Sequence, residues 1–308
     1  MKKSSISSVI SRVSKKMFME FKMGWRKDVW WRFRVPSIIV RILFRIIEKE
    51  NCGIYVMQED WDNLVVLDAC AYNVFAETNW IKGTLEKKNS RGSHTWMFFQ
   101  ENFKDYYADT IYISSNPFIW EFRDYFYRVA YIAPKEEIET YGTVLPETVL
   151  KQALEVSNKY PNKRLIIHFL QPHYPFIGET KIGNDKIKNT NPFYLLGKGE
   201  IEEADLRRAY SDNLKRALPY VEKLVNEIPG KTIITSDHGE AFGAWARPFP
   251  IRIYGHSGPR IKELVEIPWL VIEKEPRKRI IADESKETPK DIYYENEVRK
   301  HLQSLGYI

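Results

Sequence analysis

Six residues combine a reactive side chain with a position at the end of an apolar run, in a turn or at the start of a helix. They are Asp68, Thr95, His173, Asp237, His238 and His256. Carboxylate, imidazole and hydroxyl groups in one set suit Zn²⁺ or Mn²⁺ best, with Mg²⁺ or Ca²⁺ as alternatives. A hydroxyl next to such a cation has a lowered pKa and becomes a nucleophile. These residue types therefore predict a metal-dependent site that attacks an ester.

The pair Asp237-His238 follows a short β-branched run, 231–235, which predicts a buried strand. Ligands of open α/β sheets bind at the carboxyl ends of strands, and this pair emerges there. Gly239 lets the chain turn away, so both side chains can reach one divalent cation. The alternative is an aspartate that caps a helix, followed by a solvated histidine.

Three further candidates occupy comparable positions. Asp68 follows a continuous apolar run, and His173 lies between two prolines after a second such run. A histidine between prolines is held in place, which suits metal ligation or anion binding. His256 lies in a glycine turn and is a third candidate histidine. His168 stands inside the second apolar run, and we interpret it as a hydrogen-bonded core residue.

Thr95 stands where a small-residue turn is followed by a helix-compatible stretch, 96–103. A hydroxyl residue at a helix start is usually a cap. The free N–H groups of such a helix also attract phosphate or sulfate. We take Thr95 as the candidate nucleophile because the helix-compatible stretch begins immediately after it. Ser93 is the alternative.

The spacing of apolar residues predicts the elements that position these groups. Buried strands are expected before Asp68, His173 and Asp237. The other expected elements are strands at 110–114 and 268–272, helices at 71–79, 146–156, 203–227 and 293–305, and irregular stretches at 118–131 and 179–200. Alternating strands and helices predict an α/β fold with a doubly wound, mostly parallel sheet and helices on both faces.

Residues 1–50 differ in charge from the rest of the chain. They hold thirteen Lys and Arg against four Asp and Glu, a net charge of +9, so residues 51–308 carry −3 of the total +6. Their apolar residues have helical spacing, which predicts basic amphipathic helices joined by a Trp-rich bend. Such helices suit an anionic membrane surface, and the alternative is packing on the domain. We expect an N-terminal helical segment, 1–50, and one catalytic domain, 51–308.

Composition disfavours several function classes. Apolar residues at 44% and charged residues at 29% are ordinary for a globular protein. No regular interleaving of aromatic and basic residues occurs, so we expect no nucleic-acid partner. Cys52 and Cys70 form no metal or disulfide pattern, which indicates a reducing compartment. Since no apolar run is long enough for a membrane span and no signal peptide is evident, we expect a cytoplasmic protein, either free or peripheral on the inner face of the membrane.

Five motifs occur in a fixed order along the chain. They are Val66-Leu67-Asp68-Ala69-Cys70, Gln171-Pro172-His173-Tyr174-Pro175, Ser236-Asp237-His238-Gly239-Glu240, Tyr254-Gly255-His256 and Ile267-Pro268-Trp269-Leu270. Together they resemble the motifs of the alkaline phosphatase/sulfatase superfamily, and most closely its sulfatase-like branch found in archaea. The resemblance covers roughly residues 60–275 and leaves the N-terminal segment outside.

The resemblance implies a role for each candidate. Asp68, Thr95, Asp237 and His238 would hold one divalent cation, His173 would contact the transferred phosphate or sulfate, and His256 would bind a second metal or the substrate. The chain departs from the family pattern at Ala71 and Asn73, where relatives commonly have Arg and Asp, and it lacks the Cys/Ser-x-Pro-x-Arg motif that sulfatases convert to formylglycine. The implied activity is that of a hydrolase or transferase of phosphoesters with a Thr or Ser nucleophile. A sulfatase and a non-catalytic, membrane-associated relative are the alternatives.

Overall fold

The computed structural model describes residues 51–182, 191–256 and 258–283. Along these ranges the elements, with η marking 3-10 helices, are η2 (Val56–Gln58), β1 (Asn63–Leu67), α3 (Tyr72–Thr78), β2 (Thr84–Asn89), α4 (Thr95–Asn102), β3 (Tyr107–Ser114), η3 (Pro117–Tyr125), β4 (Phe126–Tyr131), α5 (Lys135–Tyr141), α6 (Pro146–Lys159), β5 (Arg164–Phe169), α7 (Pro192–Lys198), α8 (Glu203–Glu227), β6 (Thr232–Thr235), β7 (Ala241–Trp245), β8 (Arg252–Gly255), α9 (Lys262–Val265) and β9 (Glu266–Ile272).

Seven strands of the described residues form one sheet in the order β2-β9-β6-β1-β5-β3-β4. β6, β1, β5, β3 and β4 run parallel, whereas β9 is antiparallel to both of its neighbours. Val66 on the central strand β1 pairs with His168 on β5 and with Thr235 on β6. The carboxyl ends of these three strands therefore meet at one edge of the sheet.

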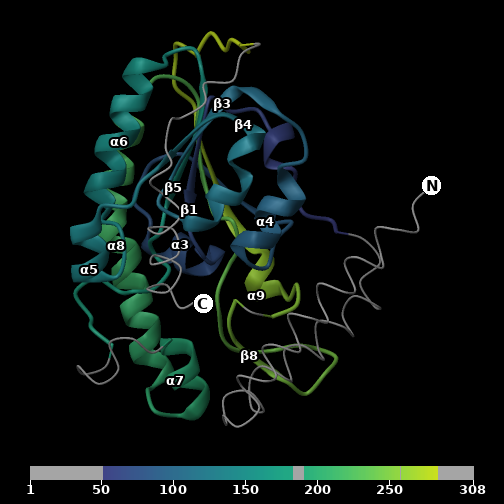
Figure 1. The fold of residues 1–308 in the computed structure, drawn as a ribbon. Coiled ribbons are helices and arrows are strands. Elements are labelled where there is room, and N and C mark those ends of the chain that lie inside the picture. Colours follow the sequence, from purple (N-terminus) through teal and green to yellow (C-terminus); the bar gives the residue numbers. More distant parts are fainter. Residues whose placement is uncertain (1–50, 183–190, 257, 284–308) are drawn as a thin grey trace.

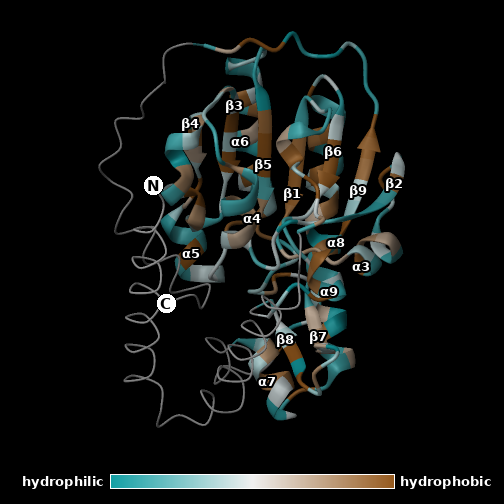
Figure 2. Ribbon diagram, turned by 90° about the vertical axis from the view of Figure 1, so that its right-hand side faces the viewer, coloured by the Kyte–Doolittle hydropathy of each residue, from teal (hydrophilic) through white to brown (hydrophobic). Residues whose placement is uncertain are grey.

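The strands differ in composition according to whether they lie under helices or at the edge of the sheet. Every residue of β1 is buried, as expected for a strand with helices over both faces of its sheet. β2 at the edge is mostly exposed and carries Glu86, Lys87 and Lys88, which discourage pairing with another chain. The hydropathy colours show this contrast between the central strands and β2 (Figure 2).

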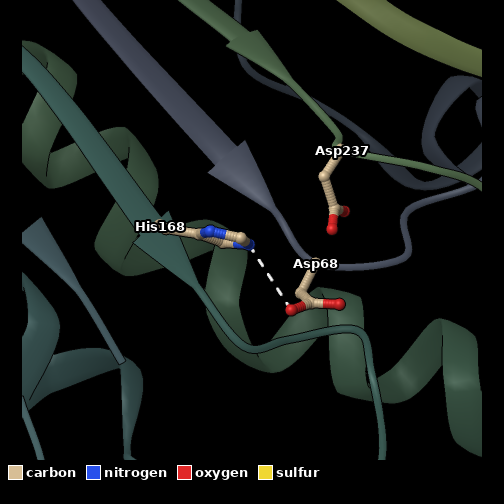
Figure 3. A group of neighbouring side chains, drawn as sticks. All are labelled: Asp68, His168 and Asp237. Carbon is tan, nitrogen blue, oxygen red and sulfur yellow. Dashed lines mark ion pairs between the residues drawn. The ribbon is translucent and has the colours of Figure 1, made fainter. Parts of the chain in front are cut away.

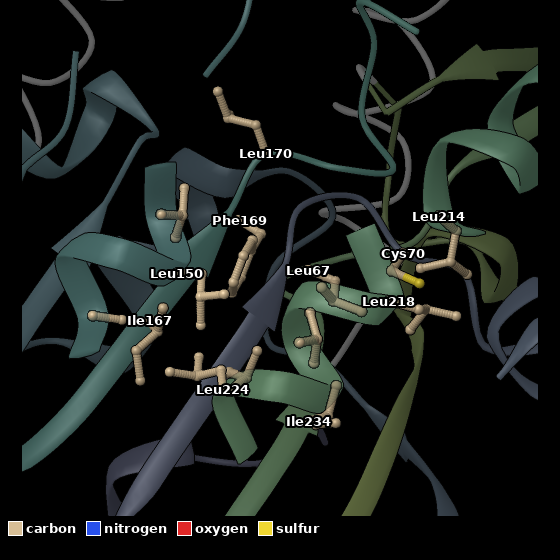
Figure 4. Close-up of a cluster of buried hydrophobic side chains, with 14 of the residues drawn as sticks. Leu67, Cys70, Leu150, Ile167, Phe169, Leu170, Leu214, Leu218, Leu224 and Ile234 are labelled. Atoms are coloured by element: carbon tan, nitrogen blue, oxygen red, sulfur yellow. The ribbon is translucent and has the colours of Figure 1, made fainter. Parts of the chain in front are cut away.

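Helices cover both faces of the sheet (Figure 1). α6 and α8 lie on one face, and α4 with η3 lies on the other. The inner side of α8 packs Leu214, Leu218 and Leu224 against the sheet, in the same buried cluster as Leu67 and Ile234 (Figure 4). Burial of these side chains ties α8 to the strands that carry the candidate site. None of the helices in the described ranges has the length and apolar composition of a membrane span.

The predicted fold class is confirmed: the sheet is mostly parallel, with helices on both faces. Two irregular stretches were predicted wrongly. Residues 118–131 form most of η3 and the edge strand β4, which packs in the core, and residues 192–198 form α7. The strand β2 was not predicted at all. The helices expected within 1–50 and at 293–305 lie outside the described residues.

A separate two-stranded hairpin, β7–β8, lies beyond the carboxyl-end edge of the sheet, next to α7 (Figure 2). Its inner side packs Ala241, Ala246 and Ile253 against Ile261 and Leu264. The hairpin begins directly after Glu240 and ends directly before His256. It therefore connects two parts of the candidate site described next.

Candidate metal centre

Asp68, His168 and Asp237 each bring one side-chain atom to a common point, with the three atoms within 4.8 Å of one another. Asp68 directly follows β1, His168 belongs to β5, and Asp237 follows β6, so three adjacent strands supply the group (Figure 3). All three side chains are fully buried. A cluster of this composition at the carboxyl ends of parallel strands is a candidate metal centre.

The donor atoms of this group are incompletely paired within the protein. Asp68 Oδ1, His168 Nε2 and Asp237 Oδ2 are buried without a hydrogen-bond partner. The second oxygen of each carboxylate is held: Asn116 Nδ2 donates to Asp68 Oδ2 at 2.6 Å. The backbone N–H groups of Ala69 and His238 donate to Asp237 Oδ1 at 3.0 Å each. Because an unpaired buried carboxylate oxygen is costly, the donor set fits a divalent cation between the two aspartates.

The charge state of Asp68 agrees with this interpretation. Burial alone would raise the pKa of Asp68, but the contact with His168 and the charges of nearby histidines lower this pKa below its usual value. Asp68 Oδ2 lies 3.4 Å from His168 Nε2. The Asp68 side chain is therefore a carboxylate, the form that ligates cations.

His238 presents its Nε2 atom to the same centre. Its Nδ1 lies 2.8 Å from the carbonyl oxygen of Gly239, and since a carbonyl only accepts, Nδ1 carries the proton. In the neutral ring, Nε2 then has the lone pair that a metal requires. Nε2 lies 3.3 Å from Asp237 Oδ2 and 3.8 Å from Asp68 Oδ1. His238 is thus oriented as a ligand by its own backbone.

Thr95 is the first residue of α4 and is buried against His238. Its Oγ1 lies 3.3 Å from His238 Nε2. Ser93 points elsewhere, because its hydroxyl donates to the carbonyl of Gly258 at 3.2 Å and contacts Met97 Sδ at 3.8 Å. The helix N-cap is His94, whose Nδ1 accepts from the Met97 N–H, so the Thr95 hydroxyl is not used as the cap.

Two more histidines lie beside this group. The rings of His256 and His238 are 4.7 Å apart between centroids, and those of His256 and His173 are 5.0 Å apart. His173 Nδ1 donates to the backbone carbonyl of Tyr174, and burial lowers the pKa of His173. The structure therefore places all six predicted residues within one region at the carboxyl ends of the strands.

Glu240 holds His256 in a charged pair. His256 Nδ1 lies 3.2 Å from Glu240 Oε1 and 3.1 Å from Oε2. Burial acts to lower the pKa of His256, but the Glu240 carboxylate raises it above its usual value. The contact with Glu240 therefore favours the protonated form of His256, the form that suits contact with an anion.

Hydrogen bonds between the loops after β1 and β6 fix the two aspartates relative to each other. Ser236 Oγ accepts from the Cys70 N–H at 2.7 Å and donates to the Leu67 carbonyl at 2.6 Å. Ala69 has a φ of 58°, a left-handed conformation that residues with side chains rarely adopt. This turn points the Ala69 N–H at Asp237. Strain of this kind is typical of functional sites.

Sequence reasoning missed three residues of the site: His168 as a donor to it, Asn116 and Glu240. His168 is a buried residue as predicted, and Tyr112 Oη lies 3.0 Å from its Nδ1, but its Nε2 faces Asp68. Asn116 follows β3 in the same way that Asp68 follows β1, and this shared position was the available signal. Glu240 follows Asp237-His238 closely enough to be a candidate from spacing alone.

The residues that depart from the family pattern border a separate cavity. Ala71 and Asn73 line a cavity of about 440 Å³ together with Arg207, Glu240 and Phe242. Asp68, His168 and Asp237 do not line it. The cavity therefore borders the metal centre through Glu240. In its wall, the smaller Ala71 and the uncharged Asn73 stand where the motif pattern commonly has Arg and Asp.

The fold and the site define a doubly wound α/β protein with a metal-type donor set at the edge where strand ends meet. No family model matches the chain, and no curated protein matches it. Solved structures do match. The integral membrane lipooligosaccharide phosphoethanolamine transferase A from Neisseria meningitidis is 14% identical over 69% of this chain and 47% of its own, with a TM-score of 0.44. This chain thus spans about half the length of that protein.

Two further solved structures are similar. The C-terminal periplasmic domain of EptC from Escherichia coli, in complex with Zn, is 16% identical over 69% of this chain and 72% of its own, with a TM-score of 0.48. A protein in the alkaline phosphatase superfamily from Vibrio parahaemolyticus is 14% identical over 73% of this chain and 64% of its own, with a TM-score of 0.36. Sulfatases also match. One of these structures is thus described as a member of the superfamily that the sequence motifs resemble, and the function proposed below rests on the site geometry.

Proposed function

We propose that this chain is a metal-dependent enzyme that transfers or hydrolyses a phosphoester through Thr95. One observation carries the proposal: Thr95 Oγ1 lies 3.3 Å from His238 Nε2, next to the unpaired oxygens of Asp68 and Asp237. A hydroxyl, an imidazole lone pair and two carboxylates form a mixed ligand set of the kind that binds Zn²⁺ or Mn²⁺. We therefore assign Asp68, Thr95, Asp237 and His238 as the ligands, and His168 as a further contact of Asp68.

The bound cation would lower the pKa of the Thr95 hydroxyl and neutralise charge on the transferred group. Thr95 Oγ1 then attacks phosphorus in line, the new Oγ1–P bond forms, and the bond from phosphorus to the leaving oxygen breaks with its electron pair on that oxygen. Water or an acceptor hydroxyl resolves the phosphothreonine in a second displacement. Hydrolase and transferase differ only in this acceptor.

The histidines and the helix supply the anion contacts. His256, held against Glu240, lies beside His173 and His238 and would pair with a phosphoryl oxygen. The Tyr174 carbonyl engages Nδ1 of His173 and so fixes the ring, and we assign His173 as a contact of the transferred group. The first N–H groups of α4 add positive potential next to Thr95.

Activity with two chromogenic substrates tests the proposal. Metal-free protein should gain hydrolysis of bis-p-nitrophenyl phosphate on addition of Zn²⁺ or Mn²⁺, and much less of p-nitrophenyl sulfate. Sulfatase activity is the second candidate, and the absence of a formylglycine motif disfavours it. Preference for the sulfate ester would reverse the assignment. Failure to bind any divalent cation would instead favour a non-catalytic relative.

The finer assignments extend this proposal. We place the chain in the sulfatase-like branch found in archaea on its motifs, and in a reducing compartment such as the cytoplasm, since the buried Cys70 is a free thiol. Residues 1–50 would hold the enzyme on the inner face of an anionic membrane, close to a lipid-linked or glycan substrate. Flotation with liposomes tests the last point: deletion of residues 1–36 should reduce membrane binding, and equal binding would refute this role.

A further inference from the structure

The β7–β8 hairpin has an unusual distribution of charge. The hairpin, residues 241–255, contains Arg247 and Arg252 and no Asp or Glu, although residues 51–308 as a whole carry a net charge of −3. Exposed positions in a chain of this composition normally mix both signs. The hairpin is therefore a local cationic surface on an otherwise acidic domain.

A tryptophan and two prolines lie near these cations on the exposed side of the hairpin. Trp245 is 46% exposed, and the neighbouring tip residues Arg247, Pro248 and Pro250 are exposed as well. Trp245 is paired across the hairpin with Arg252, whose guanidinium lies 4.6 Å from the indole centroid. The opposite side packs on Ile261 and Leu264, so the hairpin presents the Trp-Arg side outward.

We infer that this side of the hairpin docks on the surface of an anionic lipid bilayer. Trp is the side chain best suited to the headgroup depth of a bilayer, because its ring is apolar and its N–H remains hydrogen-bonded. Arginine guanidinium groups pair with lipid phosphates. No carboxylate within the hairpin, 241–255, opposes this contact, and the complementary charge is that of an anionic membrane.

A second exposed tryptophan, Trp80, serves as a comparison, because an acidic side chain lies beside it. Trp80 is 47% exposed, but its Nε1 donates to Glu222 Oε2 at 3.1 Å, so an acid lies beside it. Single exposed apolar side chains of this kind need no functional explanation. Trp245 differs because the side chain paired with it across the hairpin is a cation, Arg252.

Docking at this place would bring the candidate metal centre to the lipid. The base of the hairpin is the Glu240–His256 pair, and β7 adds five residues from there to Trp245. At about 3.3 Å per residue Trp245 lies about 17 Å from the base. The inference does not rest on the proposed catalysis, so its test requires no activity.

The test measures binding of the full chain to vesicles of phosphatidylcholine with about one third phosphatidylglycerol. The double variant Trp245→Ala/Arg247→Ser is compared with the matched control Trp80→Ala/Arg208→Ser, which removes an exposed Trp and an exposed Arg elsewhere. Loss of one arginine should weaken binding about fivefold, and loss of the indole should add to this. We expect the hairpin variant to bind at least about tenfold more weakly and the control less than twofold.

Two results would overturn the inference. One is equal binding of the hairpin variant and the control, which would assign any membrane contact to other parts of the chain. The other is failure of the unmodified chain to bind the anionic vesicles. Unchanged thermal unfolding of both variants establishes that the comparison concerns the surface and not the fold.

Discussion

Asp68 and Asp237 follow two adjacent parallel strands, and in each carboxylate one oxygen accepts hydrogen bonds from the protein while the other has no hydrogen-bond partner. Both free oxygens are buried in the same group as His168. Two buried carboxyl groups this close to each other are stabilised by a cation between them. The arrangement is therefore a candidate metal site, and we expect its stability to depend on a bound cation.

Replacement of Asp237 by Asn should weaken metal binding while the protein still folds. Asn keeps an oxygen for the Ala69 and His238 N–H groups and removes one buried negative charge. We expect the metal-free variant to unfold at the same or a higher temperature than the unmodified protein. Saturating Zn²⁺ or Mn²⁺ should raise the unfolding temperature of the unmodified protein by about 5–10 °C and leave the variant unchanged.

The exposed Asp205 offers the control, because Asp205→Asn should retain the full metal-induced shift. A metal-induced shift that survives Asp237→Asn would place the cation elsewhere. Calorimetric titration of the same proteins gives the metal stoichiometry, and the account predicts one tight site in the unmodified protein.

The nucleophile is tested by substitution at Thr95 and Ser93. Thr95→Ala removes the hydroxyl 3.3 Å from His238 Nε2, and we expect phosphodiesterase activity to fall by at least about 10³-fold. Thr95→Ser should retain part of the activity. Ser93→Ala should keep it within about tenfold, because Ser93 bonds to Gly258. Mass spectrometry of a trapped phosphoryl adduct identifies the residue directly, and an adduct on Ser93 would reverse the assignment.

Tyr112 should affect metal affinity through His168 and Asp68. Its Oη lies 3.0 Å from His168 Nδ1, so it orients the ring that faces Asp68. Loss of such an outer contact typically weakens metal binding by 10-fold or more, and we expect about 10-fold for Tyr112→Phe. Tyr107→Phe on the same strand also loses one hydrogen bond, to the Asn102 carbonyl, and is the matched control.

Both phenylalanine variants should lose roughly 1 kcal/mol of unfolding free energy, since each removes one hydrogen bond. Only Tyr112→Phe should change the dissociation constant for Mn²⁺. An equal change in both variants would show that the effect is one of general stability.

The two thiols should differ sharply in reactivity. Burial, assisted by the nearby Asp237 carboxylate, raises the pKa of the Cys70 thiol well above its usual value, whereas Cys52 is exposed. We expect iodoacetamide at pH 8 to label Cys52 alone in the folded protein and both residues in denaturant. Fast labelling of Cys70 in the folded protein would mean that the loop after β1 opens.

Much of the fold was predictable because the central strands are short, apolar runs that end in polar residues. Asp68 and Asp237 are found at strand ends in the structure, as expected from this pattern. The register is what sequence could not supply: His168 faces Asp68 because β5 lies beside β1 with Val66 opposite His168. Residues 118–131 were misjudged because β4 is an edge strand whose aromatic residues resemble those of an irregular pocket wall.

The most direct test of the central claim is anomalous diffraction from a crystal of the full chain soaked with Mn²⁺ or Zn²⁺, recorded at the absorption edge of the metal. The account predicts one strong peak within bonding distance of Asp68 Oδ1, Asp237 Oδ2, His238 Nε2 and Thr95 Oγ1. A soaked crystal with no peak among these four atoms, or with its strongest peak elsewhere, would contradict the account.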